Sequence, residues 1–127
     1  MPHLIIQHSE NLSEYIDVQE LCTAMHETML ASGVFPLGGI RVRAFAAGAV
    51  AIADQHPENA FADLVLRIGA GRSHEDKERV GDALMETAQG VCKRLLDKPY
   101  FALSLEIVEI NKELSWKVNT IHPRVRT

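Results

Sequence analysis

Apolar positions along the chain follow first a strand-like and then a helical pattern, and this order occurs twice. A short apolar run covers residues 3–8, and a second strand-like stretch covers residues 40–47. Between them, from about residue 13 to 32, one face of a predicted helix is apolar through Val18, Leu21, Cys22, Met25 and Met29. Gly33 follows as a helix terminator. These elements predict a βαβ unit over about residues 2–47.

The second half of the chain predicts the same order of elements. Residues 60–68 read as a strand, the Gly-Ala-Gly-Arg-Ser turn covers residues 69–73, and Ser73 is a suitable N-cap for a helix that runs to about Asp97. Pro99 ends that helix, and apolar and polar residues alternate over residues 101–110 as in a strand. The second βαβ unit therefore covers about residues 60–110, and residues 48–59 are an irregular connector.

Two consecutive βαβ units predict one α+β domain over residues 1–127. Each crossover helix lets its two strands run parallel, and joining the units gives a four-stranded mixed sheet with both helices on one face. Because the strands carry apolar residues on both faces, we expect the uncovered face to be buried against other subunits. In the tail, residues 111–127, alternation returns over residues 114–121 and predicts a short extra strand, which could add to the sheet edge of a neighbouring subunit.

Composition excludes several classes of protein. The net charge of −4 and the lack of a Lys/Arg run argue against a nucleic-acid binder. No apolar stretch is long enough to span a membrane, and no signal peptide precedes the first strand. Cys22 and Cys92 read as buried thiols in a reducing cytoplasm. The six histidines are scattered and no CxxC occurs, so no metal site is expected.

The turn at residues 69–73 is the best candidate for binding an anion. It combines two glycines, the guanidinium of Arg72 and the N-terminus of the following helix. The alternative is a tight turn that needs glycine for its geometry, with Arg72 simply solvated. The turn matches neither the GxGxxG fingerprint nor a Walker loop.

Two further arginines open the second predicted strand. Arg41 and Arg43 are two residues apart and so share a face, and Arg41 follows Gly38-Gly39-Ile40, where backbone could approach a ligand closely. The alternative is an edge strand charged for solubility. Arg67 is the weaker candidate, because Leu66 and Ile68 flank it.

Pro2 is a candidate base without a side chain. Removal of Met1, which is usual before a proline, would leave a secondary amine at the start of an apolar strand, where burial lowers its pKa towards neutrality. If the first strands of the two units are antiparallel neighbours, Pro2, Arg41 and Arg72 meet at one end of the sheet. An acidic protein with such a local cluster of cations suggests a small polyanionic substrate.

The chain resembles the tautomerase superfamily, and within it most closely the 5-carboxymethyl-2-hydroxymuconate isomerases. The resemblance covers nearly the whole chain. It is carried by Pro2-His3, by Gly-Val-Phe-Pro-Leu-Gly-Gly-Ile-Arg at 33–41, by Arg-Ile-Gly-Ala-Gly-Arg-Ser at 67–73 and by Leu-Ser-Leu-Glu-Ile-Val-Glu at 103–109.

The resemblance implies a homotrimer of double βαβ subunits with an amino-terminal proline as general acid/base and neither cofactor nor metal. The proline corresponds to Pro2, and the arginines that bind substrate carboxylates correspond to Arg41 and Arg72. The implied substrate is a dienol di- or tricarboxylate from homoprotocatechuate catabolism. In that reaction Pro2 would carry the 2-hydroxyl proton to carbon, with Arg43 a further binding residue and Phe35 and Leu37 the apolar wall.

Other functions remain open on the sequence. The same fold could serve a phenylpyruvate-type keto–enol tautomerase, a dehalogenase or a hydratase. A non-catalytic trimeric binding protein would be expected to keep Met1 or to have a blocked amino terminus. Two arginines favour a substrate with more than one carboxylate, and hence the isomerase.

Overall fold

A four-stranded mixed sheet forms the centre of the computed structural model, which describes residues 1–125. The strands are β1 (His3–Ser9), β2 (Arg41–Ala47), β3 (Ala60–Gly69) and β4 (Phe101–Ile110), in the spatial order β2-β1-β3-β4. β1 pairs parallel with β2, β3 pairs parallel with β4, and the two units join through the antiparallel pair β1 and β3. The predicted α+β class and both βαβ units are thereby confirmed.

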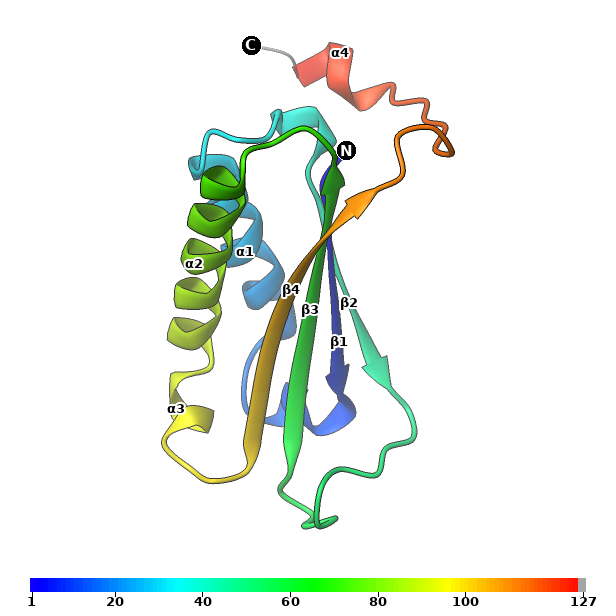
Figure 1. Ribbon diagram of the computed structural model, residues 1–127. Coiled ribbons are helices and arrows are strands. Elements are labelled where there is room, and N and C mark those ends of the chain that lie inside the picture. The colour runs from blue at the N-terminus through cyan, green and yellow to red at the C-terminus, as the bar shows by residue number, and fades with distance from the viewer. Residues whose placement is uncertain (126–127) are drawn as a thin grey trace.

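Both long helices cover the same face of the sheet (Figure 1). α1 (Val18–Ala31) begins later than predicted, because Asp17 caps it by accepting hydrogen bonds from the N–H groups of Gln19 and Glu20. The preceding residues form the 3-10 helix η1 (Glu10–Glu14) instead. α2 (His74–Val91) starts at the predicted cap Ser73 but ends at Cys92, after which α3 (Lys93–Leu96) follows. None of the helices within residues 1–125 has the length and apolar character needed to cross a membrane.

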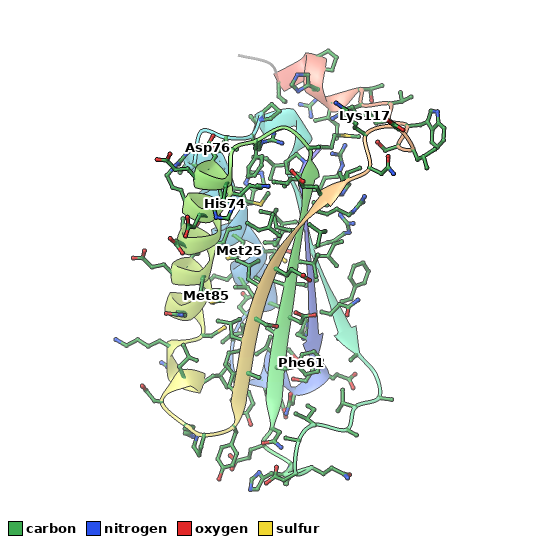
Figure 2. The ribbon with its side chains drawn as sticks, viewed as in Figure 1. Met25, Phe61, His74, Asp76, Met85 and Lys117 are labelled. Atoms are coloured by element: carbon green, nitrogen blue, oxygen red, sulfur yellow. The ribbon has the colours of Figure 1, made fainter. Side chains whose placement is uncertain are left out.

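The core lies between the sheet and these two helices. β1 and β3 are the central strands, and their helix-facing side chains are almost fully buried: Leu4, Ile6, Leu64, Leu66 and Ile68. Met25 and Met29 of α1 and Leu84 of α2 pack against them (Figure 2 labels Met25 between helix and sheet). Because β1 and β3 are both buried in this core, the start of β1 and the end of β3 are held in fixed positions next to each other.

The uncovered face of the sheet is more polar than predicted. Side chains alternate across a strand, so the partners His3, Arg41 and Arg67 share this face in one row. The next row holds Arg43, Ile5, Val65 and Glu106. Apolar residues therefore occupy the middle of the face while charged residues occupy much of the rest.

The tail differs from its predicted form. Residues 114–121 form no strand within the described chain, because the segment leaves the end of β4 without running along either free edge of the sheet. It turns back and ends in the short helix α4 (Ile121–Val125), which packs on the 3-10 helix η2 (Leu37–Gly39) (Figure 1). Leu114, Trp116 and Val118 remain strongly exposed. The last two residues of the predicted tail lie outside the described range.

Candidate active site

The sheet topology brings three predicted site segments to one end of the molecule. His3 is the register partner of Arg41 on one side and of Arg67 on the other. The backbone N–H of Arg41 donates a hydrogen bond of 3.1 Å to the carbonyl oxygen of Pro2. Because α2 begins directly after β3, the turn that carries Arg72 lies at this same end (Figure 1). The predicted meeting of Pro2, Arg41 and Arg72 at one end of the sheet agrees with this arrangement.

A cavity of about 550 Å³ opens at this end. It is lined by Pro2, by Pro36 and Gly39 from the loop before β2, by the turn after β3, and by the tail; the lining residues are Met1, Pro2, Pro36, Gly39, Gly69, Ala70, Arg72, Lys117, Asn119, His122 and Pro123. Lys117 lies at this end of the molecule in Figure 2. The cavity thus joins both predicted motifs with a segment that was not predicted to take part.

The charge of its lining, rather than its size, distinguishes this cavity from the hollow at the opposite end of β1. A hollow of about 580 Å³ lies at the other end of β1, and its lining includes Glu10 and Glu14 but neither arginine nor lysine. A small anionic substrate is therefore attracted to the end where Arg72 and Lys117 lie.

Pro2 is fully buried at the start of the central strand β1. Its ring lies close to Gly39, since a Cβ atom on Gly39 would stand 3.2 Å from the Pro2 Cδ atom. Met1 precedes it, so the Pro2 nitrogen is part of an amide bond in this structure. The pKa of the Met1 α-amine is lowered by burial first and then by the positive charges of Lys117, Arg72, Arg41 and Arg67.

Arg72 has a defined pose rather than being simply solvated. Its Nη1 donates to the carbonyl oxygen of Gly69 at 3.2 Å, and its Nη2 donates to that of Val34 at 3.5 Å. The guanidinium also lies over the Phe35 ring, 4.9 Å from its centroid. A guanidinium carries five N–H donors, so other donors remain for a ligand in the cavity. Gly71 has φ of +107°, which is the conformation that requires glycine in this turn.

Arg41 and Arg43 lie in different places although they share a strand face. Arg41 Nη1 donates to the Gly39 carbonyl oxygen at 3.0 Å and contacts the Met1 sulfur at 3.1 Å, next to the cavity. Arg43 is one row further along the sheet, where its Nη1 lies 3.1 Å from His3 Nδ1. Neither arginine lines the cavity itself, and Arg43 points to the open face of the sheet.

Phe35 and Leu37 do not form the wall that was expected beside Pro2. Phe35 is buried beneath the Arg72 guanidinium, and Leu37 is 40% exposed on η2. Pro36 and Gly39 of the same segment line the cavity in their place. Phe35 therefore acts on the site through the position of Arg72.

His3 is held neutral by its surroundings. Burial first, and then the charges of Arg67, Arg43 and Arg41, lower the pKa of His3 from 6.5 to about 4. Because a guanidinium can only donate, Arg43 donates to His3 Nδ1, and that nitrogen must be unprotonated. Arg67, the weaker candidate in the sequence, thus belongs to the group of cations around the first strand.

Sequence reasoning missed Lys117, Asn119 and His122. Asn119 Nδ2 donates to the Gly38 carbonyl oxygen at 2.9 Å, and its Oδ1 accepts from the N–H groups of Ile121 and His122. The alternating pattern of the tail predicts a strand with Lys117 and Asn119 on its polar face, so they were not considered as site residues. The signal that could have identified them is that these polar side chains alternate with apolar ones in the tail.

Two glutamates of β4, Glu106 and Glu109, do not form a catalytic pair. Glu106 and Glu109 lie on opposite faces of β4, and Glu109 forms an ion pair with Lys77 at 3.4 Å. Within residues 1–125, histidine, cysteine and carboxylate side chains form no group of three or more that could hold a metal ion.

Comparison with known proteins identifies one family over nearly the whole chain. The profile of the 5-carboxymethyl-2-hydroxymuconate isomerase family matches residues 2–125. The chain is 36% identical over 122 residues to the 5-carboxymethyl-2-hydroxymuconate Delta-isomerase of Escherichia coli, covering 96% of this chain and 97% of that protein.

Solved structures agree with this match. The crystal structure of a 5-carboxymethyl-2-hydroxymuconate isomerase from Deinococcus radiodurans R1 has a TM-score of 0.92 at 39% identity, covering 99% of this chain and 95% of that chain. Another 5-carboxymethyl-2-hydroxymuconate delta-isomerase has a TM-score of 0.91 at 30% identity, covering 100% and 94%. A fused 4-OT asymmetric trimer, at 14% identity and a TM-score of 0.69, covers 98% and 99% and shares the fold alone. Given the profile match and these relatives, the chain belongs to the 5-carboxymethyl-2-hydroxymuconate isomerase family.

Proposed function

We propose that this chain isomerises 5-carboxymethyl-2-hydroxymuconate without a cofactor, in the catabolism of homoprotocatechuate. The observation that carries the proposal is the cavity in which Pro2 and Arg72 meet, in a chain that belongs to this isomerase family. The reaction transfers one proton: the O–H bond at carbon 2 breaks, the double bonds shift, and a new C–H bond forms to give the 2-oxo isomer. The composition of the substrate is unchanged, so no oxidant or reductant takes part.

Pro2 is the proposed carrier of that proton. Removal of Met1 converts the Pro2 nitrogen from an amide to a secondary amine at the edge of the cavity. The conditions that lower the pKa of the Met1 amine, burial first and then the nearby cations, also act on an amine one residue further in. A neutral amine accepts the hydroxyl proton and returns it to carbon.

The arginines have different proposed tasks. Arg72 lines the cavity and binds one carboxylate, and it stabilises the negative charge that develops on the conjugated oxygen. Arg41, which contacts Met1, reaches a second carboxylate once Met1 is absent. Phe35 supports Arg72, and Leu37 is an exposed apolar side chain on η2 that a larger ligand can contact. Arg43 contributes positive charge through its contact with His3 and is the most distant of the proposed substrate-binding residues.

A homotrimer is the proposed assembly, with the open face of the sheet buried between subunits. The central Ile5 and Val65 of that face support this proposal, and the positive row through Arg41 and Arg67 can meet acidic groups such as Glu106 of another copy. The two free cysteines, Cys22 and Cys92, suit the proposed location in a reducing cytoplasm.

The test is isomerisation of 5-carboxymethyl-2-hydroxymuconate, followed by ultraviolet absorbance with protein whose intact mass shows that it begins at Pro2. A matched control carries a leucine inserted between Met1 and Pro2, which blocks trimming and keeps the Pro2 nitrogen as an amide. We expect rapid conversion by the first protein and none by the second. Equal activity of both would remove Pro2 from the mechanism. Turnover of phenylpyruvate in place of this substrate would assign a different tautomerase activity.

A further inference from the structure

We infer that the tail supplies a third substrate-binding cation, Lys117, and that Lys117 selects substrates with a third carboxylate. This inference deepens the proposed function and rests on it for the identity of the substrate. Its structural basis is the cavity, where Lys117 lies on the lining together with Pro2 and Arg72.

The first argument concerns the position of the charge. Among the charged groups around the amino terminus, Lys117 lowers the pKa of the Met1 amine most, ahead of Arg72 and Arg41. A Coulombic effect falls with distance, so the Lys117 ammonium lies well within reach of a ligand beside Pro2. The ion pairs formed among residues 1–125 involve other side chains, so the charge of Lys117 remains for a ligand.

The second argument is that the tail is held over the cavity by specific contacts. Asn119 donates from Nδ2 to the Gly38 carbonyl oxygen at 2.9 Å and accepts at Oδ1 from the first N–H groups of α4. The backbone of His122 lies directly on Gly38, because a Cβ atom there would stand only 2.5 Å from the His122 Cα atom. The segment that carries Lys117 is therefore held by two contacts with Gly38 of η2, from Asn119 and from His122.

The third argument is chemical. The proposed substrate has three carboxylates, and Arg72 and Arg41 account for two of them. An exposed ammonium on a flexible stem suits a carboxylate on a flexible carboxymethyl arm, because it needs no fixed bidentate geometry. The same dienol without the carboxymethyl group, 2-hydroxymuconate, has nothing for Lys117 to bind. Lys117 thus affects specificity more than the proton transfer itself.

The test compares Lys117→Met with the parent enzyme on these two substrates. We expect KM for 5-carboxymethyl-2-hydroxymuconate to rise at least about fivefold, the effect of a partly exposed charge pair, with kcat changed less than twofold. KM for 2-hydroxymuconate should change less than twofold. Lys117→Arg should restore most of the affinity. Lys112→Met, which removes a charge from the same tail outside the cavity lining, is the control and should leave both KM values unchanged.

A second pair of variants separates the placement of the tail from the charge. Asn119→Ala removes the contact with Gly38 and should raise KM for 5-carboxymethyl-2-hydroxymuconate as Lys117→Met does. Asn111→Ala removes a similar pair of local bonds, from the N–H groups of Glu113 and Leu114, further from the cavity, and should not. Equal KM for Lys117→Met and the parent enzyme on 5-carboxymethyl-2-hydroxymuconate would overturn the inference while leaving the proposed function intact.

A binding measurement covers the case in which the proposed function fails. Trp116 is the single tryptophan, neighbours Lys117 and is 86% exposed, so its fluorescence reports ligands at the tail. Propane-1,2,3-tricarboxylate should bind the parent protein more tightly than the dicarboxylate glutarate, and Lys117→Met should remove the difference. That result without any isomerisation would keep Lys117 as a carboxylate-binding residue of a different enzyme or binding protein. Identical titrations of parent and variant without isomerisation would overturn both proposals.

Discussion

The guanidinium of Arg72 lies over the Phe35 ring, with its central carbon 4.9 Å from the ring centroid. The same side chain donates to the backbone of Val34, which follows α1, and of Gly69, which ends β3. Arg72 therefore connects the two βαβ units at the point where the cavity opens. The structural contacts of Arg72 and its proposed role in binding substrate can be separated by experiment.

Replacing Arg72 by alanine should reduce kcat/KM about 100- to 1000-fold, as expected for the loss of one group that stabilises developing charge. The free energy of unfolding should fall by only about 1–2 kcal/mol, since the lost contacts are two hydrogen bonds and one cation–π pair. Arg79→Ala is the matched control, because Arg79 also donates to a carbonyl oxygen after α1, that of Ser32, but lies outside the cavity lining. Steady-state kinetics and urea unfolding check both effects; equal losses in the two variants would make Arg72 purely structural.

Gly39→Ala should reduce kcat about tenfold with little effect on folding. The added Cβ would stand 3.2 Å from the Pro2 Cδ atom and displace the proline ring by a few tenths of an ångström, and reacting groups tolerate such displacement poorly. Gly90→Ala provides the control, since a Cβ at that helical position meets no neighbouring atom within 4 Å. Unchanged kcat in Gly39→Ala would show that Pro2 does not need this close approach.

The value of kcat/KM should rise with pH through the pKa of the free Pro2 amine, because only the unprotonated amine is a base. Burial and nearby cations lower the pKa of the Met1 amine, and we expect them to act in the same direction on Pro2, so the rising limb should lie at a pH lower than about 8, the value of an ordinary α-amine. Removing a cation, as in Lys117→Met, should raise that pKa and move the limb to higher pH. A profile that is flat through neutrality would contradict the assignment of Pro2.

His3→Gln should make the protein less sensitive to acid between pH 6.5 and about 4. The folded-state pKa of His3 is lowered to about 4, so between these values the unfolded chain binds a proton that the folded chain does not, and stability falls as pH falls. Above pH 6.5 both states are neutral at this residue, and the penalty is absent. Urea midpoints at pH 7 and 4.5, at one protein concentration, measure the difference. His74→Gln, at a side chain that is 90% exposed, should behave as the parent protein.

The sequence predicted the fold well because the determinants are local and periodic. Ser73 in front of a charged first turn, Gly33 with φ of +72° after α1, and the alternation over residues 101–110 each specify one element. Antiparallel pairing of the two first strands then follows from burying the most apolar strands in the centre. The ends of the helices were less predictable, because Asp17 could be recognised as a cap only once its contacts with Gln19 and Glu20 were known.

The site was only partly predictable, and for a different reason. Pro2 and Arg72 could be brought together by topology alone, since strand order places the start of β1 beside the end of β3. Lys117 and Asn119 come from a segment whose position depends on the contacts of Asn119 and His122 with Gly38, which is far away in the sequence. No periodic pattern encodes such a contact. The same limit explains why Phe35, expected beside Pro2, lies under Arg72 instead.

The amino terminus and a segment within residues 117–123 line the same cavity, and this has a consequence for the order of events during synthesis. Pro2 is buried next to the start of a strand that lies between two others, and Lys117, Asn119, His122 and Pro123 line the same cavity as Met1, so we expect a peptidase to reach Met1 less readily once the chain has folded. We therefore expect Met1 to be removed most easily during translation, after the amino terminus has left the ribosome and before residues 111–125 have been made. If Pro2 carries the proton as proposed, folded molecules that keep Met1 lack that base, and the active fraction of a preparation depends on how early each chain is trimmed.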